Sequence, residues 1–352
     1  MTRVHQFHPV LAPGDAMSNH VFALQQRIRA WGHEAFAYAV EAKPGAPDVL
    51  PYRRLFRDVR PDDLLIVHFS MGNEIFTQLA KIHARKVLVY HNITPAEFFR
   101  GVNPHTAMHA RLGRKQLVEL APAFALGIGV SAYNQRELDA VGYARTAYVP
   151  ILIDWRAYDV APDDTVLARW SGIHPILLFV GRVAPHKRQD DLIRMLAYYR
   201  ACIDPNARLV LVGGYSDQPQ YHARLVELVR ALKLEAAVTF TGAVTSAALV
   251  AHFRSADAFV SLSEHEGFGV PLLEAMHFDV PVIAYDAAAV GETTGGAALL
   301  LHDRDLASAA EAIGLVLERR ELRERLIAAG QVRVAAFGPD LVAERTREVL
   351  GL

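Results

Sequence analysis

The sequence has almost no cysteine and no long apolar run. Cys202 is the single cysteine among 352 residues, which excludes an intramolecular disulfide and is typical of a protein in the reducing cytoplasm. No group of cysteine and histidine residues has the spacing of a metal site, so we expect no metal. No apolar stretch approaches the roughly 18–20 residues that a membrane span needs. Residues 1–7 also lack the apolar core of a signal peptide, so we expect a cytoplasmic protein.

The sequence also lacks a strong excess of charge, since its formal net charge is −1. Residues 1–152 hold 17 basic and 12 acidic side chains, a net +5, and residues 153–352 hold 20 and 26, a net −6. A basic half suits an anionic partner or the inner face of a membrane, although so small a difference also fits scattered surface charge. The aromatic and basic residues of segments 96–100 and 108–115 suit either a membrane surface or an amphipathic helix packed on its own domain. No nucleic-acid motif accompanies them, and we expect no nucleic-acid partner.

What the sequence does contain is repeated alternation of strand-like and helix-like segments, which is typical of parallel, doubly wound α/β sheets. A chain of 352 residues suits two domains of roughly 150–200 residues each. We expect an N-terminal Rossmann-like domain over residues 1–152 and a second one over residues 153–338. The strands expected in the first domain cover residues 4–10, 34–39, 63–69, 86–90, 124–130 and 146–150, with helices over 18–31 and 134–140. Those expected in the second cover residues 176–180, 209–212, 238–241, 258–262 and 280–284, with helices over 271–277, from 305 to a stop at Gly330, and over 340–350.

Glu266 and Glu274, separated by seven residues around a glycine turn, are the most informative pair in the chain. Gly267 and Gly269 allow a tight loop and close approach of the backbone to a ligand. Pro271 fits the first turn of a helix whose free amides attract a phosphate. A carboxylate accepts hydrogen bonds from the hydroxyls of a ribose or hexose. The segment as a whole indicates a nucleotide-sugar site. For either glutamate taken alone, an equal alternative is that its charge only balances the helix dipole.

A second motif, Gly181-Arg182 with Lys187 five residues after Arg182, follows the expected strand at 176–180. Ligands of open α/β sheets bind at the carboxyl ends of the strands, where this loop is expected to lie. Two positioned cations stabilise the charge that develops on a departing diphosphate. A basic surface loop is the alternative, because charged side chains are mostly exposed.

These two motifs resemble those of the retaining glycosyltransferases of family 4. The family's hallmark is a pair of glutamates seven residues apart, often written around Glu-Gly-Phe-Gly-x-Pro-x-x-Glu-Ala, and residues 266–275 match it. The family also has Gly-Arg-x-x-x-x-Lys-Gly, but this chain has Arg188 in place of the last glycine, which leaves the shape of that loop open. The resemblance implies the GT-B fold, with two Rossmann-like domains facing across a cleft and a terminal helix within 339–352 packed back on the first domain.

The resemblance also implies roles for the residues of the second domain. The donor diphosphate is expected on the amides of Gly269 and Val270, clamped by Arg182 and Lys187, with Glu274 on the ribose hydroxyls. The sugar is expected against Glu266, near its third hydroxyl, with Phe268 shaping the pocket and Gly267 offering backbone contacts. Glycines and a valine in further loops complete the expected donor site: Gly14, Gly181, Gly213 and Val244.

Two features of the first domain carry less specific signals. His91 follows the expected strand at 86–90 and corresponds to a family histidine that faces the sugar. Without the resemblance, a histidine that only caps the end of the strand is an equal alternative. Gly14 stands where the family has two glycines, and an N-capped turn at Asp15 or Ser18 suits this loop better. Residues 127–132 imitate a dinucleotide fingerprint only in part, and no Walker A sequence is present. The residues expected to act in catalysis are His91, Arg182, Lys187 and Glu266.

Taken with the resemblance, the motifs predict a metal-independent, retaining glycosyltransferase without a cofactor. Its donor is expected to be a nucleotide sugar, with GDP-mannose-like and UDP-sugar donors both open. Its acceptor is expected to be a hydroxyl of a saccharide or of a polyprenyl-diphosphate-linked acceptor, in cell-surface polysaccharide synthesis. A non-catalytic nucleotide-sugar-binding subunit and a GT-B sugar-nucleotide epimerase are the alternatives, and a nicotinamide dehydrogenase fits the motifs least well.

Overall fold

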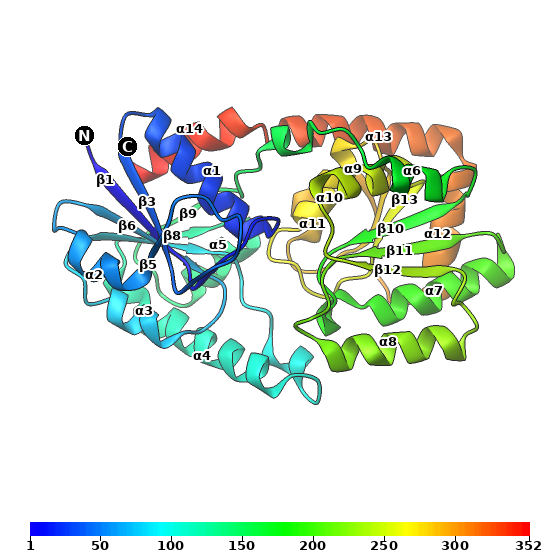
Figure 1. Ribbon diagram of the computed structural model, residues 1–352, viewed down its shortest axis with the longest axis horizontal. Coiled ribbons are helices and arrows are strands. Elements are labelled where there is room, and N and C mark those ends of the chain that lie inside the picture. The colour runs from blue at the N-terminus through cyan, green and yellow to red at the C-terminus, as the bar shows by residue number, and fades with distance from the viewer. The chain divides into compact units, whose positions relative to one another are not determined.

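The computed structural model describes residues 1–352 and divides into two compact α/β units (Figure 1). Unit 1 comprises Met1–Arg100, Pro104–Trp155 and Phe337–Leu352. Unit 2 comprises Gly101–Asn103 and Arg156–Ala336. The boundary expected from the sequence, between residues 152 and 153, lies three residues before the chain passes from unit 1 into unit 2.

Unit 1 is built on a seven-stranded parallel sheet with the order β5-β3-β1-β6-β7-β8-β9. Its strands are β1 (Arg3–Phe7), β3 (Glu34–Ala39), β5 (Val49–Pro51), β6 (Leu64–Phe69), β7 (Arg85–Tyr90), β8 (Leu126–Gly129) and β9 (Thr146–Tyr148), and a separate pair is formed by β2 (Val10–Leu11) and β4 (Glu41–Ala42). Its α-helices are α1 (Ala16–Ala30), α2 (Leu55–Asp58), α3 (Glu74–Leu79), α4 (Pro104–Leu120), α5 (Ala132–Ala140) and α14 (Pro339–Leu350).

The central strands of unit 1 are continuous apolar runs because helices cover both faces of the sheet. Every residue of β6 is buried, and so is β7 after its first residue. Side chains of α3 and α4 pack on one core cluster of these strands. The terminal helix α14 belongs to the same unit and lies beside α1 (Figure 1). Its Val342 and Ala343 pack with Leu152 and with Ala23 of α1.

Unit 2 is built on a six-stranded parallel sheet with the order β12-β11-β10-β13-β14-β15. Its strands are β10 (Ile176–Val180), β11 (Arg208–Val212), β12 (Val238–Gly242), β13 (Ala258–Ser261), β14 (Val282–Tyr285) and β15 (Ala298–Leu301). Its α-helices are α6 (Asp164–Trp170), α7 (Gln189–Cys202), α8 (Pro219–Ala231), α9 (Ser246–Ser255), α10 (Val270–His277), α11 (Val290–Thr294), α12 (Leu306–Glu318) and α13 (Arg320–Ala335). Short 3₁₀ turns include η4 (Trp155–Tyr158) at the passage between the units and η5 (Pro185–Lys187) after β10.

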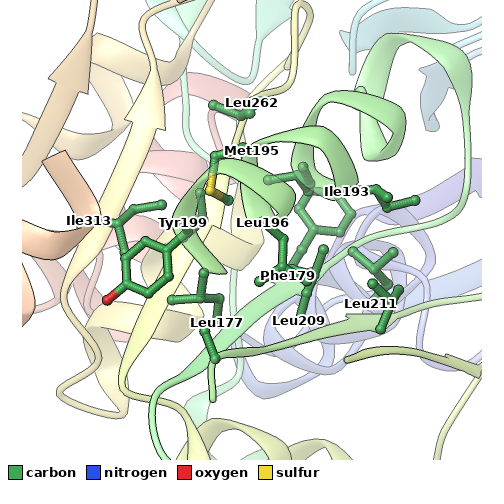
Figure 2. Close-up of a cluster of buried hydrophobic side chains, with 14 of the residues drawn as sticks. Leu177, Phe179, Ile193, Met195, Leu196, Tyr199, Leu209, Leu211, Leu262 and Ile313 are labelled. Carbon is green, nitrogen blue, oxygen red and sulfur yellow. The ribbon is translucent and has the colours of Figure 1, made fainter. Parts of the chain in front are cut away.

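The helices of unit 2 cover its sheet on both faces, with α7, α8 and α12 on one side and α9, α10 and α13 on the other (Figure 1). Figure 2 shows the core under α7, where Ile193 and Leu196 meet Leu177, Phe179 and Leu209 of the strands. Both units are thus doubly wound parallel sheets, and the predicted fold class is confirmed.

The predicted helical stretch from residue 305 to a stop at Gly330 is wrong in two respects. It is two helices, α12 and α13, which meet at Arg319, and α13 continues through Gly330 to Ala335. Gly330 does not end the helix, because it lies where α13 crosses α10. A Cβ at this position would be 3.1 Å from Cγ of Met276, so the glycine provides close contact between the two helices. Strand β15 was not predicted.

One stretch, Arg320–Leu350, meets the length and hydropathy expected of a membrane-spanning helix. It consists of α13 in unit 2 and α14 in unit 1, separated at Ala336–Gly338. Within it, Arg333 donates to the carbonyl oxygen of Thr293, and Asp340 pairs with Arg27 at 2.7 Å. The stretch is therefore two packed helices of a folded chain, and its composition alone carries no argument for a span.

Candidate functional site

The turn between β13 and α10 leaves a helix N-terminus whose first amides no side chain caps. Gly269 is the N-cap, with φ of +92°, a conformation that favours glycine. A Cβ there would also lie 2.8 Å from Cδ1 of Leu272. Pro271 stands in the first turn, where its missing N–H is harmless. The Leu272 N–H donates to the Gly269 carbonyl at 3.0 Å, and the Val270 N–H is left to bind an anion, where the sequence analysis expects the diphosphate.

Glu266 and Lys187 form an ion pair beside this turn. Lys187 Nζ lies 2.6 Å from each carboxylate oxygen of Glu266. The lysine and glutamate side chains are 18% and 12% exposed, so the pair is largely shielded from solvent. Lys187 comes from η5 after β10, and Glu266 from the loop after β13, which is the neighbouring strand in the sheet. Two site residues predicted from different motifs are thus brought into direct contact.

Glu274 is a buried carboxylate with a single hydrogen-bond partner. Tyr158 of η4 donates its hydroxyl to Oε1 of Glu274. Burial raises the pKa of the Glu274 carboxyl to about 7, and the hydrogen bond from Tyr158 opposes that rise. A buried carboxyl with so perturbed a pKa is typical of functional sites.

Arg182 lies at the rim of the loop after β10. Its side chain is 73% exposed and stands 3.4 Å from Asp217, also exposed. The pair contributes little to stability, because exposed ion pairs are weak. Arg182 is therefore free to move toward an anion, while its predicted role as a phosphate clamp stays a prediction.

Arg188 keeps the backbone shape that the family's glycine would give. Its φ and ψ are 52° and 41°, in the left-handed region. Its guanidinium pairs with Asp191 at 2.7 Å and with Asp190 at 3.3 Å. The substitution of arginine for glycine therefore leaves the turn in place and adds a network of charges beside Lys187.

Two further glycines are explained by backbone contact between the ends of β10 and β11. A Cβ at Gly213 would lie 2.1 Å from the carbonyl oxygen of Gly181. The Gly181 N–H donates to the carbonyl of Val212 at 2.8 Å, which joins the two strand ends. Val244 is half-buried in the loop before α9. Of the remaining predicted residues, Phe268 is 4% exposed, and its carbonyl accepts from the Thr293 hydroxyl at 2.6 Å.

In unit 1, His91 follows β7 as predicted and is half-buried beside the buried His68 and His20. Gln6 donates through Nε2 to the Val21 carbonyl at 3.1 Å, so its oxygen accepts from His68 Nε2 at 3.0 Å. His68 Nδ1 then accepts from His91 Nε2, also at 3.0 Å. This network assigns the proton of His91 to Nε2 and leaves its buried Nδ1 without a partner.

Ring nitrogens of the three histidines lie within 4.8 Å of one another, which raises the question of a metal. His20 Nδ1 accepts from the Leu152 N–H at 2.9 Å, and the lone pair of His68 Nδ1 is taken by His91. A metal would need these lone pairs as ligands. Burial lowers the pKa of His20 to about 4 and holds the pKa values of His68 and His91 well below the ordinary value. The group is thus accounted for as neutral, hydrogen-bonded imidazoles, and we assign no metal to it.

The other glycine motifs of unit 1 have local structural explanations, and the donor-site role of Gly14 stays a prediction. Gly14 lies in an exposed turn with φ of +83°, and the following Asp15 caps α1 by accepting from Ser18 N at 3.1 Å. A Cβ at Gly129 would lie 2.3 Å from Gln135 N, so the partial dinucleotide fingerprint reflects the close packing of α5 on β8.

Sequence reasoning missed Tyr158, Gln6 and His68. Tyr158 comes from a segment without a motif, 116 residues before its partner, and nothing in its neighbourhood marks it. Gln6 and His68 lie inside strands that were predicted, but a strand pattern does not show which of its polar residues meet. Only the pairing of β1 with β6 places these two side chains together.

Comparison with solved structures defines the class of fold. The chain superposes on the structure of Anabaena Alr3699/HepE in complex with UDP-glucose with a TM-score of 0.81 and 18% identity, covering 100% of both chains. The protein therefore has the GT-B fold.

The family relationship is carried by unit 2. Residues 169–333, which lie in unit 2, match the family "Glycosyl transferases group 1". The chain is 30% identical to a D-inositol 3-phosphate glycosyltransferase of Kineococcus radiotolerans, over 68% of this chain and 59% of the relative. It is 27% identical to a GDP-mannose-dependent alpha-mannosyltransferase of Mycobacterium tuberculosis, over 78% of this chain and 76% of the relative. The chain spans between half and three fifths of the length of the first two curated relatives that it matches.

Proposed function

We propose that the protein is a retaining glycosyltransferase that moves a sugar from a nucleoside-diphosphate sugar to a hydroxyl acceptor. The observation that carries the proposal is the grouping, within the region that matches the group 1 family, of the uncapped N-terminus of α10, the Lys187–Glu266 pair and the buried Glu274. An anion site, a cation and two carboxylates suit the diphosphate and the hydroxyl-bearing rings of a nucleotide sugar.

In the proposed reaction, the diphosphate lies on the first amides of α10, and Lys187 and Arg182 stabilise the charge of the departing nucleoside diphosphate. Glu274 accepts hydrogen bonds from the ribose, and Glu266 holds the donor sugar. Retention follows if the acceptor attacks from the side of the leaving group and gives its proton to the leaving phosphate oxygen. His91 then orients the sugar as a neutral imidazole. No step in this scheme uses a metal or a covalent intermediate.

The donor is proposed from two classes. One relative is named as dependent on GDP-mannose and one structural neighbour holds UDP-glucose, so the base is a matter for experiment. We propose a saccharide or polyprenyl-diphosphate-linked acceptor, in cell-surface polysaccharide synthesis at the cytoplasmic face of the membrane. The exposed face of α4, with Met108, Arg111, Lys115 and Val118, supports a peripheral membrane contact through unit 1.

A donor screen tests the function. The purified protein is incubated with UDP-glucose, UDP-N-acetylglucosamine, GDP-mannose and ADP-glucose, and release of nucleoside diphosphate is measured with and without simple saccharide acceptors. We expect slow hydrolysis of donors of one base and faster release with an acceptor, with the anomeric configuration retained by NMR. Binding without release or transfer would indicate a non-catalytic subunit. Conversion of the sugar without release would indicate an epimerase.

A further inference from the structure

Tyr158 holds the carboxylate that is expected to meet the nucleoside. Its hydroxyl donates to Oε1 of Glu274, which accepts no other hydrogen bond from the protein at either oxygen. We propose that Tyr158 is a positioning residue of the donor site, fixing Glu274 through Oε1 and keeping it ionised so that Oε2 accepts from the ribose diol. The inference rests on the proposed function, because it gives Glu274 the role of ribose acceptor.

The tyrosine is itself held rigidly enough to serve this purpose. Its ring packs against those of His277 and Phe278, with centroids 5.9 and 5.8 Å apart. Its hydroxyl has one proton to donate, and Glu274 receives it. Burial and the neighbouring carboxylate raise the pKa of the Tyr158 hydroxyl, so it remains a donor throughout the working pH range.

Glu274 has no other means of keeping its charge. It is 8% exposed and sits in the second turn of α10, and burial disfavours the ionised form. The elements packed on α10 bring Glu292 of α11, Arg333 of α13 and Tyr285 of β14, and His277 lies three residues further along α10. None of these groups bonds to the carboxylate or contributes to its pKa shift, which is set by burial and by Tyr158 alone.

The arrangement changes what Glu274 offers a ligand. A free carboxylate can take both hydroxyls of a diol, one on each oxygen. Here one lone pair of Oε1 is already used, and Oε2 has both of its own available. A ribose would therefore be bound mainly through Oε2. If the Tyr158 hydroxyl were lost, the carboxyl would take up a proton more readily and would lose acceptor strength at neutral pH.

The test is the pH profile of nucleoside diphosphate binding in Tyr158→Phe. This substitution keeps the ring and its packing and removes the hydroxyl. Affinity for UDP and GDP is measured by calorimetry from pH 6 to pH 9. We expect affinity to fall about tenfold at pH 7, the effect of one charge-assisted hydrogen bond, and to recover in part toward pH 9 as Glu274 ionises. In a protein that already carries Glu274→Gln, adding Tyr158→Phe should cause no further loss of nucleotide affinity.

A matched control is Tyr221→Phe. Tyr221 is also a tyrosine of unit 2, buried where Tyr158 is half-buried, and it donates its hydroxyl to Asp190 at 2.9 Å, but that carboxylate is also paired with Arg188 and Arg194. We expect Tyr221→Phe to leave the pH profile of binding unchanged. A tenfold loss in both variants without a pH dependence would reduce the role of Tyr158 to general packing and overturn the inference.

A second measurement does not need a nucleotide. The pKa of Glu274 is about 7, above that of an unfolded glutamate, so its contribution to stability is present at low pH and is lost as pH rises through 7. Tyr158→Phe should enlarge the fall in melting temperature between pH 5 and pH 8.5, and Glu274→Gln should reduce it. If the fall in melting temperature were the same in Tyr158→Phe as in the wild type, this inference would be contradicted and the proposed function would be unaffected. If wild-type protein bound no nucleoside diphosphate, the proposed function would fail, although the link between Tyr158 and Glu274 would still be measured.

Discussion

Lys187 Nζ lies 2.6 Å from both carboxylate oxygens of Glu266. An ammonium has three N–H groups, and this geometry uses two of them, so the third remains for a phosphate oxygen. Lys187 can therefore contact the diphosphate without leaving Glu266. In the proposed function the ion pair joins the two ends of the donor, since the lysine is proposed to neutralise the leaving group and the glutamate to contact the sugar.

The first prediction concerns this pair. Lys187→Ala removes the cation that is proposed to bind the diphosphate and leaves Glu266 without its partner at either oxygen. We expect the affinity for UDP or GDP in calorimetry to fall about ten- to a hundredfold, the effect of a lost hydrogen bond to a charged group. The free energy of unfolding should also fall by about 1–3 kcal/mol, because a shielded carboxylate is left unpaired.

Arg320→Ala is the control for Lys187→Ala. It also breaks an ion pair, with Glu324 at 2.7 Å, but both side chains are well exposed on α13. The free energy of unfolding and the affinity for UDP or GDP should both stay near the wild-type values. If Lys187→Ala behaved like Arg320→Ala, the lysine would have no role at the diphosphate.

The second prediction concerns the contact between the ends of β10 and β11. Gly213→Ala places a Cβ 2.1 Å from the Gly181 carbonyl oxygen, so the two strand ends must move apart. We expect a loss of about 2–4 kcal/mol in the free energy of unfolding, measured by urea titration. Gly214→Ala is the matched control, because its Cβ would meet nothing within 4 Å and its φ is not positive. Equal losses in the two variants would contradict the steric explanation.

The fold was predictable to the extent that it depends on local pattern. Strands β3 and β10 begin and end where the sequence predicted, because each is a short and mostly apolar run. Gly330 shows the limit of such reasoning. A glycine near the end of a helical pattern is typical of a helix stop, but here it allows α13 to approach Met276, a contact that no local pattern contains.

The candidate site was predictable where its residues stand in one string. Glu266, Gly269 and Glu274 are separated by a few residues, and their spacing predicted the turn and the helix. The partner of Glu274 was not predictable, because Tyr158 reaches it only through the folding of a segment 116 residues away. Polar contacts between distant strands, such as Gln6 with His68, depend on sheet order in the same way.

The third prediction concerns Arg188, where the chain departs from the family's glycine. Arg188→Gly relieves the left-handed conformation, which costs a non-glycine residue about 1–2 kcal/mol. It also removes the guanidinium from Asp191 and Asp190, whose side chains are only 12% and 24% exposed. We expect the loss of pairing to dominate, with a net decrease of about 1–2 kcal/mol in the free energy of unfolding.

Lys233→Gly is the control, since Lys233 also has a positive φ of 56° but is exposed and makes no ion pair. That variant should be neutral or slightly stabilised, and a stabilised Arg188→Gly would show that strain outweighs the charge network.

The fourth prediction concerns the acid stability of the buried histidines of unit 1. Burial lowers the pKa of His20 to about 4, below its ordinary value of 6.5, so the unfolded chain binds the proton more readily than the folded one. The contribution of His20 to stability is therefore complete above pH 6.5 and is lost as pH falls toward 4, by on the order of 2–3 kcal/mol for a shift of this size.

The variant His20→Asn keeps an acceptor near the Leu152 N–H and removes the titrating imidazole. We expect this variant to be less stable than wild type at pH 7 because it leaves a small cavity, but to lose less stability between pH 7 and pH 4.5. The measurement is the free energy of unfolding in urea at both values of pH, and a parallel decline in the two proteins would show that His20 is not among the groups that make the fold acid-sensitive.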